Sequence, residues 1–276
     1  MRKTLALLLA LLTLLCLTAC GGETAEEPAP TGEWRMTKET QYYADGSLMM
    51  WTEYEYDDRG NLTKETHYDD DGSVEYWVEY ERDERGNLIK GTSHKADGWV
   101  FNWFEYEYDD KDLRRKATVY DAYGEVERWD EYEYDDEGKR IKWTQYDAAG
   151  NFDGYWFEYE YDDQGREIKL TMFRPDGSLV RWEEYEYDAQ GRWIKELAFY
   201  GDGSVQLWRE CEYDDQGDLT KVTSYNPNWG VDSWDIYEYD DQGNERKATF
   251  FNQNGDVVNW LEYEWQFYEN APTTEK

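Results

Sequence analysis

Polar and apolar residues alternate one by one along most of the chain. Residues 51–57 read Trp, Thr, Glu, Tyr, Glu, Tyr, Asp, which places successive side chains on opposite faces, as in a β-strand. The ten-residue stretch 51–60 returns with a leading Trp at 77, 103, 129, 156, 182, 208 and 234, and a partial copy begins at 260. The period is 26 residues, and one insertion near Gly154 makes it 27. A period of this length predicts a repeat architecture.

Each repeat unit contains two strands and two turns. After the strand 51–57, Asp57 suits the first position of a type I turn, and Gly60 supplies the positive φ of a following bulge. The second strand, 64–68, ends at a second turn, 69–72. Pro175 and Pro227 fall on the second position of that turn, where a fixed φ is favourable. Short turns require antiparallel neighbours. With the half unit at 38–42, we expect an all-β fold, a repetitive antiparallel β-meander of about 18 short strands in a curved or coiled elongated sheet.

The alternation also predicts what each face of the sheet carries. If Asp57 pairs with Asn61, one face collects positions 52, 54, 56, 62, 64, 66, 68 and 74, a Tyr/Val/Lys face. The opposite Trp/Glu face carries 51, 53, 55 and 57. We expect the Tyr/Val/Lys face to be concave and more buried, because it has the larger apolar area. The Trp side chains would then pack outside, against Ile89, Ile141, Ile168 and Ile194. Open sheet edges are expected near Lys38 and Trp265.

The repeat resembles the YD-repeat (RHS) family, whose motif is Tyr-x-Tyr-Asp-x-x-Gly-Arg-Leu/Ile. The copies nearest to that motif are 159–168 and 185–194, and the resemblance covers roughly residues 34–265. It implies coiled antiparallel strands, and in longer arrays of that family a shell that sometimes surrounds a toxin. This chain is short and has no toxin-like domain after the array, so the resemblance implies the strand architecture rather than a toxin shell.

Composition and charge narrow the class of protein. The chain has 64 acidic and 29 basic residues in 276, a formal charge of −35. Few aliphatic residues and high charge are typical of disorder, but 15 Trp and 26 Tyr supply the apolar area that disordered chains lack. The negative charge also disfavours binding to a phosphate backbone, so no nucleic acid partner is expected.

The N-terminus has the features of a lipoprotein signal. Arg2 and Lys3 precede the apolar run 5–17, which is too short to span a membrane. It ends in Leu17-Thr18-Ala19-Cys20-Gly21, which resembles the lipobox of bacterial lipoproteins. The resemblance implies cleavage after residue 19, a diacylglycerol on Cys20, and anchoring to the outer face of a bacterial membrane. We therefore divide the chain into a signal peptide (1–19), a flexible acidic linker (20–33), the repeat array (34–265) and a C-terminal tail (266–276).

We expect a membrane-anchored binding or scaffold module rather than an enzyme. Rings beside carboxylates could bind a glycan, cell-wall material or a protein, and the alternative is that the Trp column only stabilises cross-strand packing. The candidate ligand strip consists of Trp51, Trp77, Trp103, Trp129, Trp156, Trp182, Trp208, Trp234 and Trp260 with Glu53, Glu79, Glu105, Glu131, Glu158, Glu184 and Glu210. Identical carboxylate pairs in every unit indicate architecture and not one catalytic pair.

Few other residues suggest chemistry. His94 occupies a repeat Tyr position and is expected to pack there, His67 is expected on the surface, and Cys211 is expected to be a small substitute for a repeat Tyr. No cofactor is expected beyond the lipid. Asp69, Asp70 and Asp71 are weak Ca²⁺ candidates, because this ion needs six to eight oxygen ligands. A calcium-binding surface protein and an accessory or immunity protein of a YD-repeat toxin system remain alternatives, the second by resemblance alone.

Overall fold

The computed structural model describes residues 32–152 and 154–269. The chain divides into a compact unit, Trp34–Phe267, and a second that combines Met1–Glu33 with Tyr268–Lys276. Of the second unit, only the outermost residues of the first and last strands are described. The strands are β1 (Gly32–Tyr43), β2 (Leu48–Tyr56), β3 (Leu62–Asp69), β4 (Val74–Arg82), β5 (Leu88–Lys95), β6 (Val100–Tyr108), β7 (Arg114–Asp121), β8 (Val126–Tyr134), β9 (Arg140–Asp147), β10 (Trp156–Tyr161), β11 (Glu167–Phe173), β12 (Leu179–Tyr187), β13 (Trp193–Tyr200), β14 (Val205–Tyr213), β15 (Leu219–Tyr225), β16 (Val231–Tyr239), β17 (Glu245–Asn252) and β18 (Val257–Glu269).

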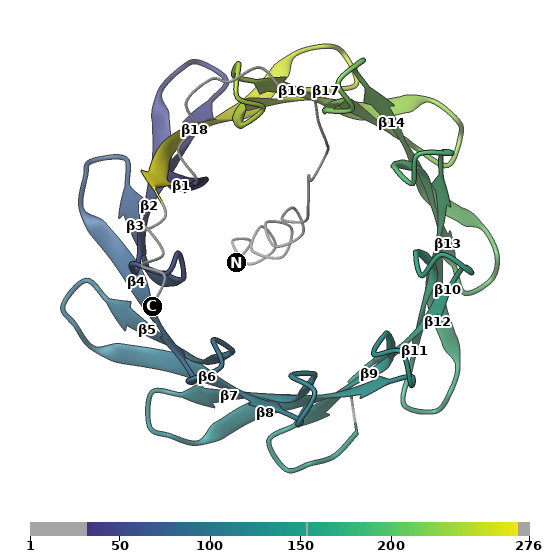
Figure 1. Cartoon of the computed structure of the whole chain (residues 1–276). Helices are drawn as coiled ribbons and strands as arrows, with labels where there is room; N and C mark the ends of the chain where they lie inside the picture. Colours follow the sequence, from purple (N-terminus) through teal and green to yellow (C-terminus); the bar gives the residue numbers. More distant parts are fainter. Residues whose placement is uncertain (1–31, 153, 270–276) are drawn as a thin grey trace, which may run out of the picture. The chain divides into compact units, whose positions relative to one another are not determined.

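The 18 strands form an antiparallel meander that closes into a barrel (Figure 1). Each strand pairs with its neighbours in sequence, and β18 pairs with β1. The expected repetitive antiparallel architecture is thus confirmed. The expectation of open edges near Lys38 and Trp265 is wrong, because Lys38 forms an ion pair with Glu264 across the closing seam. The last strand also continues to Glu269, four residues into the segment expected as a tail.

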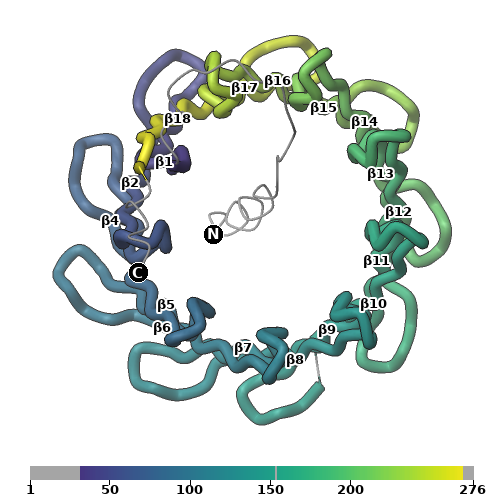
Figure 2. The backbone as a smooth tube through the Cα atoms, in the orientation of Figure 1, coloured from purple at the N-terminus to yellow at the C-terminus, as the bar shows by residue number. Residues whose placement is uncertain are grey.

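Closure of the barrel uses the same packing as each repeat unit. Trp51 stacks on Tyr68 of the following strand, with ring centroids 4.8 Å apart. At the seam, Trp260 of β18 stacks in the same way on Tyr42 of β1, at 5.3 Å. The half unit at the start of the chain therefore completes the unit at its end, and the tube view shows similar hairpins repeated around the ring (Figure 2).

The turns form as the sequence predicts. The amide of Asp57 donates to the carbonyl of Asn61, the amide of Gly60 donates back to Asp57, and Gly60 has φ +89°. The second kind of turn repeats this pattern from Asp69 to Ser73, with Gly72 at φ +85°. Glycine is favoured there because a side chain at this φ is strained.

A bulge beside each turn changes the pairing register. Tyr56 pairs with Leu62 as expected, but Glu55, rather than Tyr54, pairs with Lys64. The bulge sets two residues of β3 against one of β2, so the rest of β3 turns to the other face of the sheet. Thr66 then lies opposite Glu53, and Tyr68 lies opposite Trp51. The expected grouping of Lys64, Thr66, Tyr68 and Val74 with Tyr54 is therefore wrong.

The two faces of the corrected sheet differ in exposure. One face carries Trp51, Glu53, Glu55, Lys64, Thr66 and Tyr68 with their equivalents, and the other carries Thr52, Tyr54, Tyr56, Glu65 and His67 with theirs. On the first face the Glu55 and Glu107 side chains are 63% and 68% exposed. On the second face Glu183 and Glu196 are only 14% and 9% exposed. Side chains converge on a concave surface, so we assign the second face to the inner wall and the first to the outer face.

The inner wall is not packed like a protein core. Eighteen strands about 4.8 Å apart give a ring of roughly 14 Å radius before strand tilt is included, wider than two opposed side chains can fill. Accordingly, no large side chain among the described residues is fully buried. Most of the buried residues are small ones within the sheet, such as Thr52, Ala198 and Ala248, and Arg35 and Glu196 are the charged exceptions. Stability thus comes from the closed ladder of strands and from side-chain rows on each face.

Candidate functional site

The outer face is built from one repeated pattern. All nine leading Trp rings lie against an aromatic ring of the following strand, at centroid distances of 3.9 to 5.4 Å. On six of them the ammonium group of a Lys also lies 4.9 to 5.8 Å from the ring centroid. The Trp side chains therefore pack on Tyr, Phe or His, and six of them also lie near a Lys ammonium.

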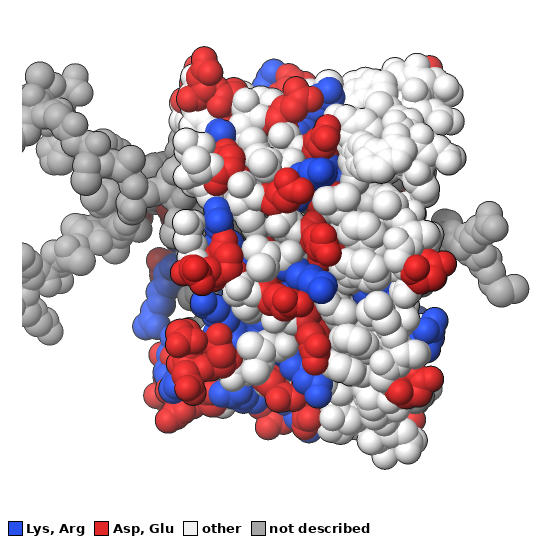
Figure 3. All heavy atoms as spheres, turned by 90° about the vertical axis from the view of Figure 1, so that its right-hand side faces the viewer, with Lys and Arg blue, Asp and Glu red and all other residues white. Residues whose placement is uncertain are grey.

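The candidate ligand strip is brought together on this outer face, where several of its polar atoms are hydrogen-bonded, although the buried indole nitrogen of Trp208 has no partner among the described residues. The indole N–H groups of Trp51, Trp182 and Trp260 donate to the Glu two residues further on, at 2.9 to 3.3 Å. The Tyr68 hydroxyl donates to Glu53. Lys–Glu pairs form the next row, as in Lys64 with Glu55 at 3.4 Å. Figure 3 shows these acidic and basic side chains as rows over one part of the barrel's length, beside a part with few charges.

One position of the inner wall varies from unit to unit, whereas two positions of the outer face do not vary. The Lys64 position is Lys in all nine units, and the Glu55 position is Glu in all nine. By contrast, the inner position of Glu65 is occupied by Gly91, Ala117, Trp143, Leu170, Glu196, Val222 and Ala248 in the later units. Such variation was visible in the sequence, but its significance depends on knowing which residues face inward.

A row of tyrosines runs around the inner wall. It consists of Tyr54, Tyr80, Tyr106, Tyr132, Tyr159, Tyr185, Tyr237 and Tyr263, with Cys211 in the remaining place. Burial raises the pKa of Tyr132 and of Tyr159 to about 12. A second inner tyrosine of most units is structural, because its hydroxyl donates to a backbone carbonyl of the preceding unit, as from Tyr134 to Arg114 at 2.8 Å.

Acidic groups occupy one sector of the inner wall, from β11 round to β3. They are Glu39, Glu65, Glu167, Glu183, Glu196, Asp235 and Glu245. Desolvation raises the pKa of Glu245 to about 7 and that of Asp235 to about 6. It also raises the pKa of Glu196, even though Arg209 donates to that carboxylate at 2.9 Å. This sector therefore holds carboxyl groups that are incompletely solvated and incompletely neutralised.

The remaining sector, from β4 to β10, is mainly aromatic and basic, with Asp130 of β8 as a partly buried acidic group. Trp143 stacks between Tyr132 and Phe157, at centroid distances of 6.5 and 4.5 Å. Arg114 and Arg140 lie among the tyrosine rings of the same strands. Sequence analysis did not single out these two arginines. The sequence does mark them, because three other units have Leu at the equivalent position, namely Leu62, Leu88 and Leu219.

The histidines and the cysteine take structural places. His94 stacks on Trp77 at 5.0 Å, as its repeat position predicts. His67 was expected on the surface, but its side chain is only 14% exposed. It stacks on Tyr76 and hydrogen-bonds Thr52 on the inner wall, because the bulge turns this part of β3 inward. Burial raises the pKa of the Cys211 thiol to about 12, which disfavours the thiolate.

The acidic turns use their carboxylates within the turn. Asp71 accepts from the amide of Ser73, and Asp69 accepts from the amide of Asp70, both at 2.8 Å. Hydrogen bonds from the side chain and the backbone of Ser73 lower the pKa of Asp71. Across residues 32–152 and 154–269, no three His, Cys, Asp or Glu side chains are placed to share a metal ion. Nor does any helix in those ranges have the length and hydrophobicity to span a bilayer. The lipidation candidate Cys20 lies outside the described residues.

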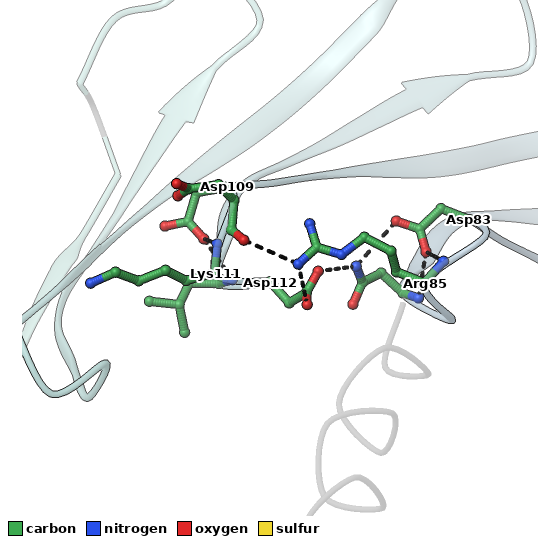
Figure 4. Close-up of polar contacts among 8 residues, drawn as sticks. Asp83, Arg85, Asp109, Lys111 and Asp112 are labelled. Atoms are coloured by element: carbon green, nitrogen blue, oxygen red, sulfur yellow. Dashed lines mark hydrogen bonds and ion pairs between the residues drawn. The ribbon is translucent and has the colours of Figure 1, made fainter.

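One pair of neighbouring turns is cross-linked by side chains (Figure 4). Asp112 stands where most units have the turn glycine, and its φ is +62°. Its carboxylate accepts from Asn87 and forms an ion pair with Arg85 of the preceding turn. Arg85 also donates to the carbonyl of Asp110 at 3.1 Å. Asp at this position therefore strains the backbone of its own turn, but its side chain links that turn to the preceding one.

Comparison with known proteins gives distant similarities. A family model described as a protein of unknown function (DUF2963) matches residues 151–198, nearly two repeat units. No curated protein matches the chain. Among solved structures, a porin-like protein from Bacteroides uniformis is 14% identical with a TM-score of 0.47, covering 84% of this chain and 96% of that one. A porin-like protein from Bacteroides vulgatus is 11% identical with a TM-score of 0.40, covering 84% and 98%. The Tc holotoxin pore of Photorhabdus luminescens is 15% identical with a TM-score of 0.32, covering 78% of this chain and 15% of that one. Likenesses this distant assign no function.

Proposed function

We propose that the chain is an exported, lipid-anchored β-barrel of YD-repeat type that binds its ligand on the inner wall. The observation that carries this proposal is the difference between the faces. Lys and Glu recur in all nine units on the outer face, whereas the inner position of Glu65 changes in nearly every unit. Residues that a fold needs recur in every unit of a repeat. Positions free of that requirement can be fitted to a ligand, and here they lie on the inner wall.

The packing of the outer strip favours a structural role for it. A sugar ring that stacks on an indole needs one open face, yet each Trp lies against an aromatic ring, and six also lie near a Lys ammonium. A glycan that stacked on those six rings would have to displace the Lys or the aromatic partner. The inner wall offers tyrosine rings and carboxylates without such repeated partners, so a glycan or other cell-wall polymer is better accommodated there.

Matched variants of the two faces test this proposal. The lipid-free mature chain, residues 21–276, would be titrated with cell-wall glycans and their soluble fragments by calorimetry. An inner variant, Trp143→Ala, removes a stacked ring from the inner wall. An outer variant, Trp129→Phe, keeps a ring on the strip but removes its indole. We expect the inner variant to lose at least tenfold in affinity and the outer variant to bind like the parent chain. If only the outer variant loses affinity, the ligand binds on the outer strip instead. If no glycan fragment binds to the parent chain, the proposal that the ligand is a glycan is contradicted.

The anchor has a separate test. Cys20→Ser removes the only thiol that the lipobox presents for acylation. We expect the parent chain to partition into detergent and the Cys20→Ser chain to remain aqueous after export. Equal partitioning of the two chains would refute lipid anchoring and leave the barrel proposal unaffected.

A further inference from the structure

Two arginines on the inner wall meet no carboxylate in a chain rich in them. The chain has 64 acidic residues against 29 basic ones, and seven other arginines form ion pairs. Among the described residues, no carboxylate oxygen lies within ion-pair distance of Arg114 in β7 or Arg140 in β9. With acidic side chains this abundant, two unpaired and partly buried guanidinium groups are unexpected.

Tyrosine rings hold both guanidinium groups. The guanidinium carbon of Arg114 lies 4.3 Å from the ring centroid of Tyr106 and 5.5 Å from that of Tyr132. The guanidinium carbon of Arg140 lies 4.5 Å from the ring centroid of Tyr159 and 5.9 Å from that of Tyr132. The order Tyr106, Arg114, Tyr132, Arg140, Tyr159 follows five consecutive strands, β6 to β10, and we name it the arginine–tyrosine ladder.

The ladder holds its cations without neutralising them. A guanidinium near the face of a ring is attracted to it but keeps its charge, and its N–H groups can still donate in the guanidinium plane. The Nε of Arg140 is buried and has no hydrogen-bond partner among the described residues. A buried donor without a partner is costly, so the Arg140 guanidinium is incompletely satisfied by the protein.

We propose that the arginine–tyrosine ladder binds a ligand that carries two linked oxyanions, phosphate or carboxylate groups. This inference rests on the proposed binding role of the inner wall and names a chemical group of its ligand. Both guanidinium carbons lie within 6 Å of the Tyr132 centroid, at 5.5 and 5.9 Å, so they are at most about 11 Å apart. With N–H to oxygen distances of about 2.8 Å on each side, that span accommodates two linked oxyanions. Arginine is suited to both groups because its donors match their paired oxygens.

The surrounding charges permit an anion here despite the charge of the whole chain. The charge of Arg114 lowers the pKa of Asp130, and the charge of Arg140 lowers the pKa of Glu167. In both groups desolvation raises the pKa by more. Neither approaches to ion-pair distance. Across a ring of roughly 14 Å radius, the opposite wall with Asp235 and Glu245 lies beyond the Debye length of about 8 Å at physiological salt. The two arginines therefore supply the attraction for an anion, and Asp130 and Glu167 are the nearby charges that oppose it.

The test uses pyrophosphate as the probe and the melting temperature of the lipid-free mature chain as the readout. Ligand bound only to the folded state raises the melting temperature. We expect 10 mM pyrophosphate to raise it by about 3 °C over sodium chloride of equal ionic strength if the ligand is near ten times its dissociation constant. Arg114→Leu with Arg140→Leu should abolish the rise. Leu already stands at this position in three other units, so this double variant is expected to fold.

Two further variants separate specific binding from a general effect of the salt. Arg114→Lys with Arg140→Lys keeps the charge and should retain a smaller rise. Arg166→Gln removes an arginine that pairs with Asp162 in a turn and should retain the full rise. An equal rise in the Leu double variant, or none in the parent chain, would overturn the anion site. If Trp143→Ala abolishes glycan binding while pyrophosphate has no effect, the inner-wall function stands and only the anion site falls.

Discussion

At the residue scale, the positions that depart from the repeat report most about local packing. Gly91 stands where other units have Glu, Ala, Trp, Leu or Val, and a Cβ built there would lie 2.1 Å from the Phe104 ring. Phe104 reaches across this strand toward Tyr80 of β4, with centroids 6.5 Å apart. The ring occupies space that a side chain fills in other units.

Gly91→Ala should therefore destabilise the barrel, although Gly to Ala in a strand is normally favourable. Overpacking of this kind costs about 1–3 kcal/mol. Phe104→Ala removes the obstructing ring, so the double variant should be less destabilised than the sum of the single variants. Urea unfolding of all four chains measures the coupling. Additive effects would show that the ring moves aside without cost.

Asp112 offers a second test at this scale, because backbone strain and side-chain contact act in opposite directions. Asp112→Gly relieves the positive φ and loses the contacts with Arg85 and Asn87. Asp112→Ala keeps the strain and loses the same contacts. We expect the Ala variant to be less stable than the Gly variant by about 1 kcal/mol in urea unfolding. Equal stability of the two variants would mean that the backbone relaxes at residue 112.

At the scale of elements, β1 has a special place, since it completes a unit that β18 begins. Thr37 donates to the carbonyl of Glu264, and Lys38 pairs with its side chain. Without β1, both β2 and β18 would expose a strand edge. Edges of this kind recruit other strands, and only closure removes them fully.

A chain that begins at Asp45 lacks β1 and should self-associate. Size-exclusion chromatography with light scattering should show oligomers, whereas a chain that begins at Gly32 should elute as the parent does. The second chain controls for loss of the N-terminal segment alone. A monomeric Asp45 chain with an unchanged circular dichroism spectrum would show that closure does not protect the edges.

At the scale of the whole molecule, two sets of carboxyl groups respond to pH in opposite directions. Glu245 and Asp235 on the inner wall have pKa values raised by desolvation to about 7 and about 6. They bind protons more tightly in the folded state, so acidification through that range favours folding. The turn carboxylates Asp57 and Asp162 have pKa values lowered by their hydrogen bonds. The stability that they add is present at neutral pH and is lost in acid.

The melting temperature should therefore rise from pH 8 to about pH 5 and fall again below about pH 4. Relief of the general negative charge adds to the rise. The double variant Glu245→Gln with Asp235→Asn separates the two causes, since it should flatten the rise and leave the acid limb unchanged. Differential scanning calorimetry across this range measures both. A melting temperature that falls steadily from pH 8 would contradict the assignment of these two groups.

The strands, the turns and the repeat itself were predictable because they depend on neighbouring residues. Alternation from Trp51 to Asp57 indicates a strand, and Gly60 and Pro175 mark turns that form as expected. The inward direction of Tyr54 was predicted correctly. The direction of Lys64 and Tyr68 was not, because a single bulge residue moves the rest of a strand to the other face.

The sequence by itself determined a repetitive antiparallel meander, its period and the grouping of the Trp and Glu columns on one face. Tertiary structure alone decided that the meander closes, that each Trp is stacked, and that Arg114 and Arg140 share the rings of the inner wall. The physical reason is one of range. Strand alternation and turn geometry depend on a few adjacent residues, whereas closure depends on curvature added over all 18 strands, and it alone makes one face concave and brings side chains of separate strands together.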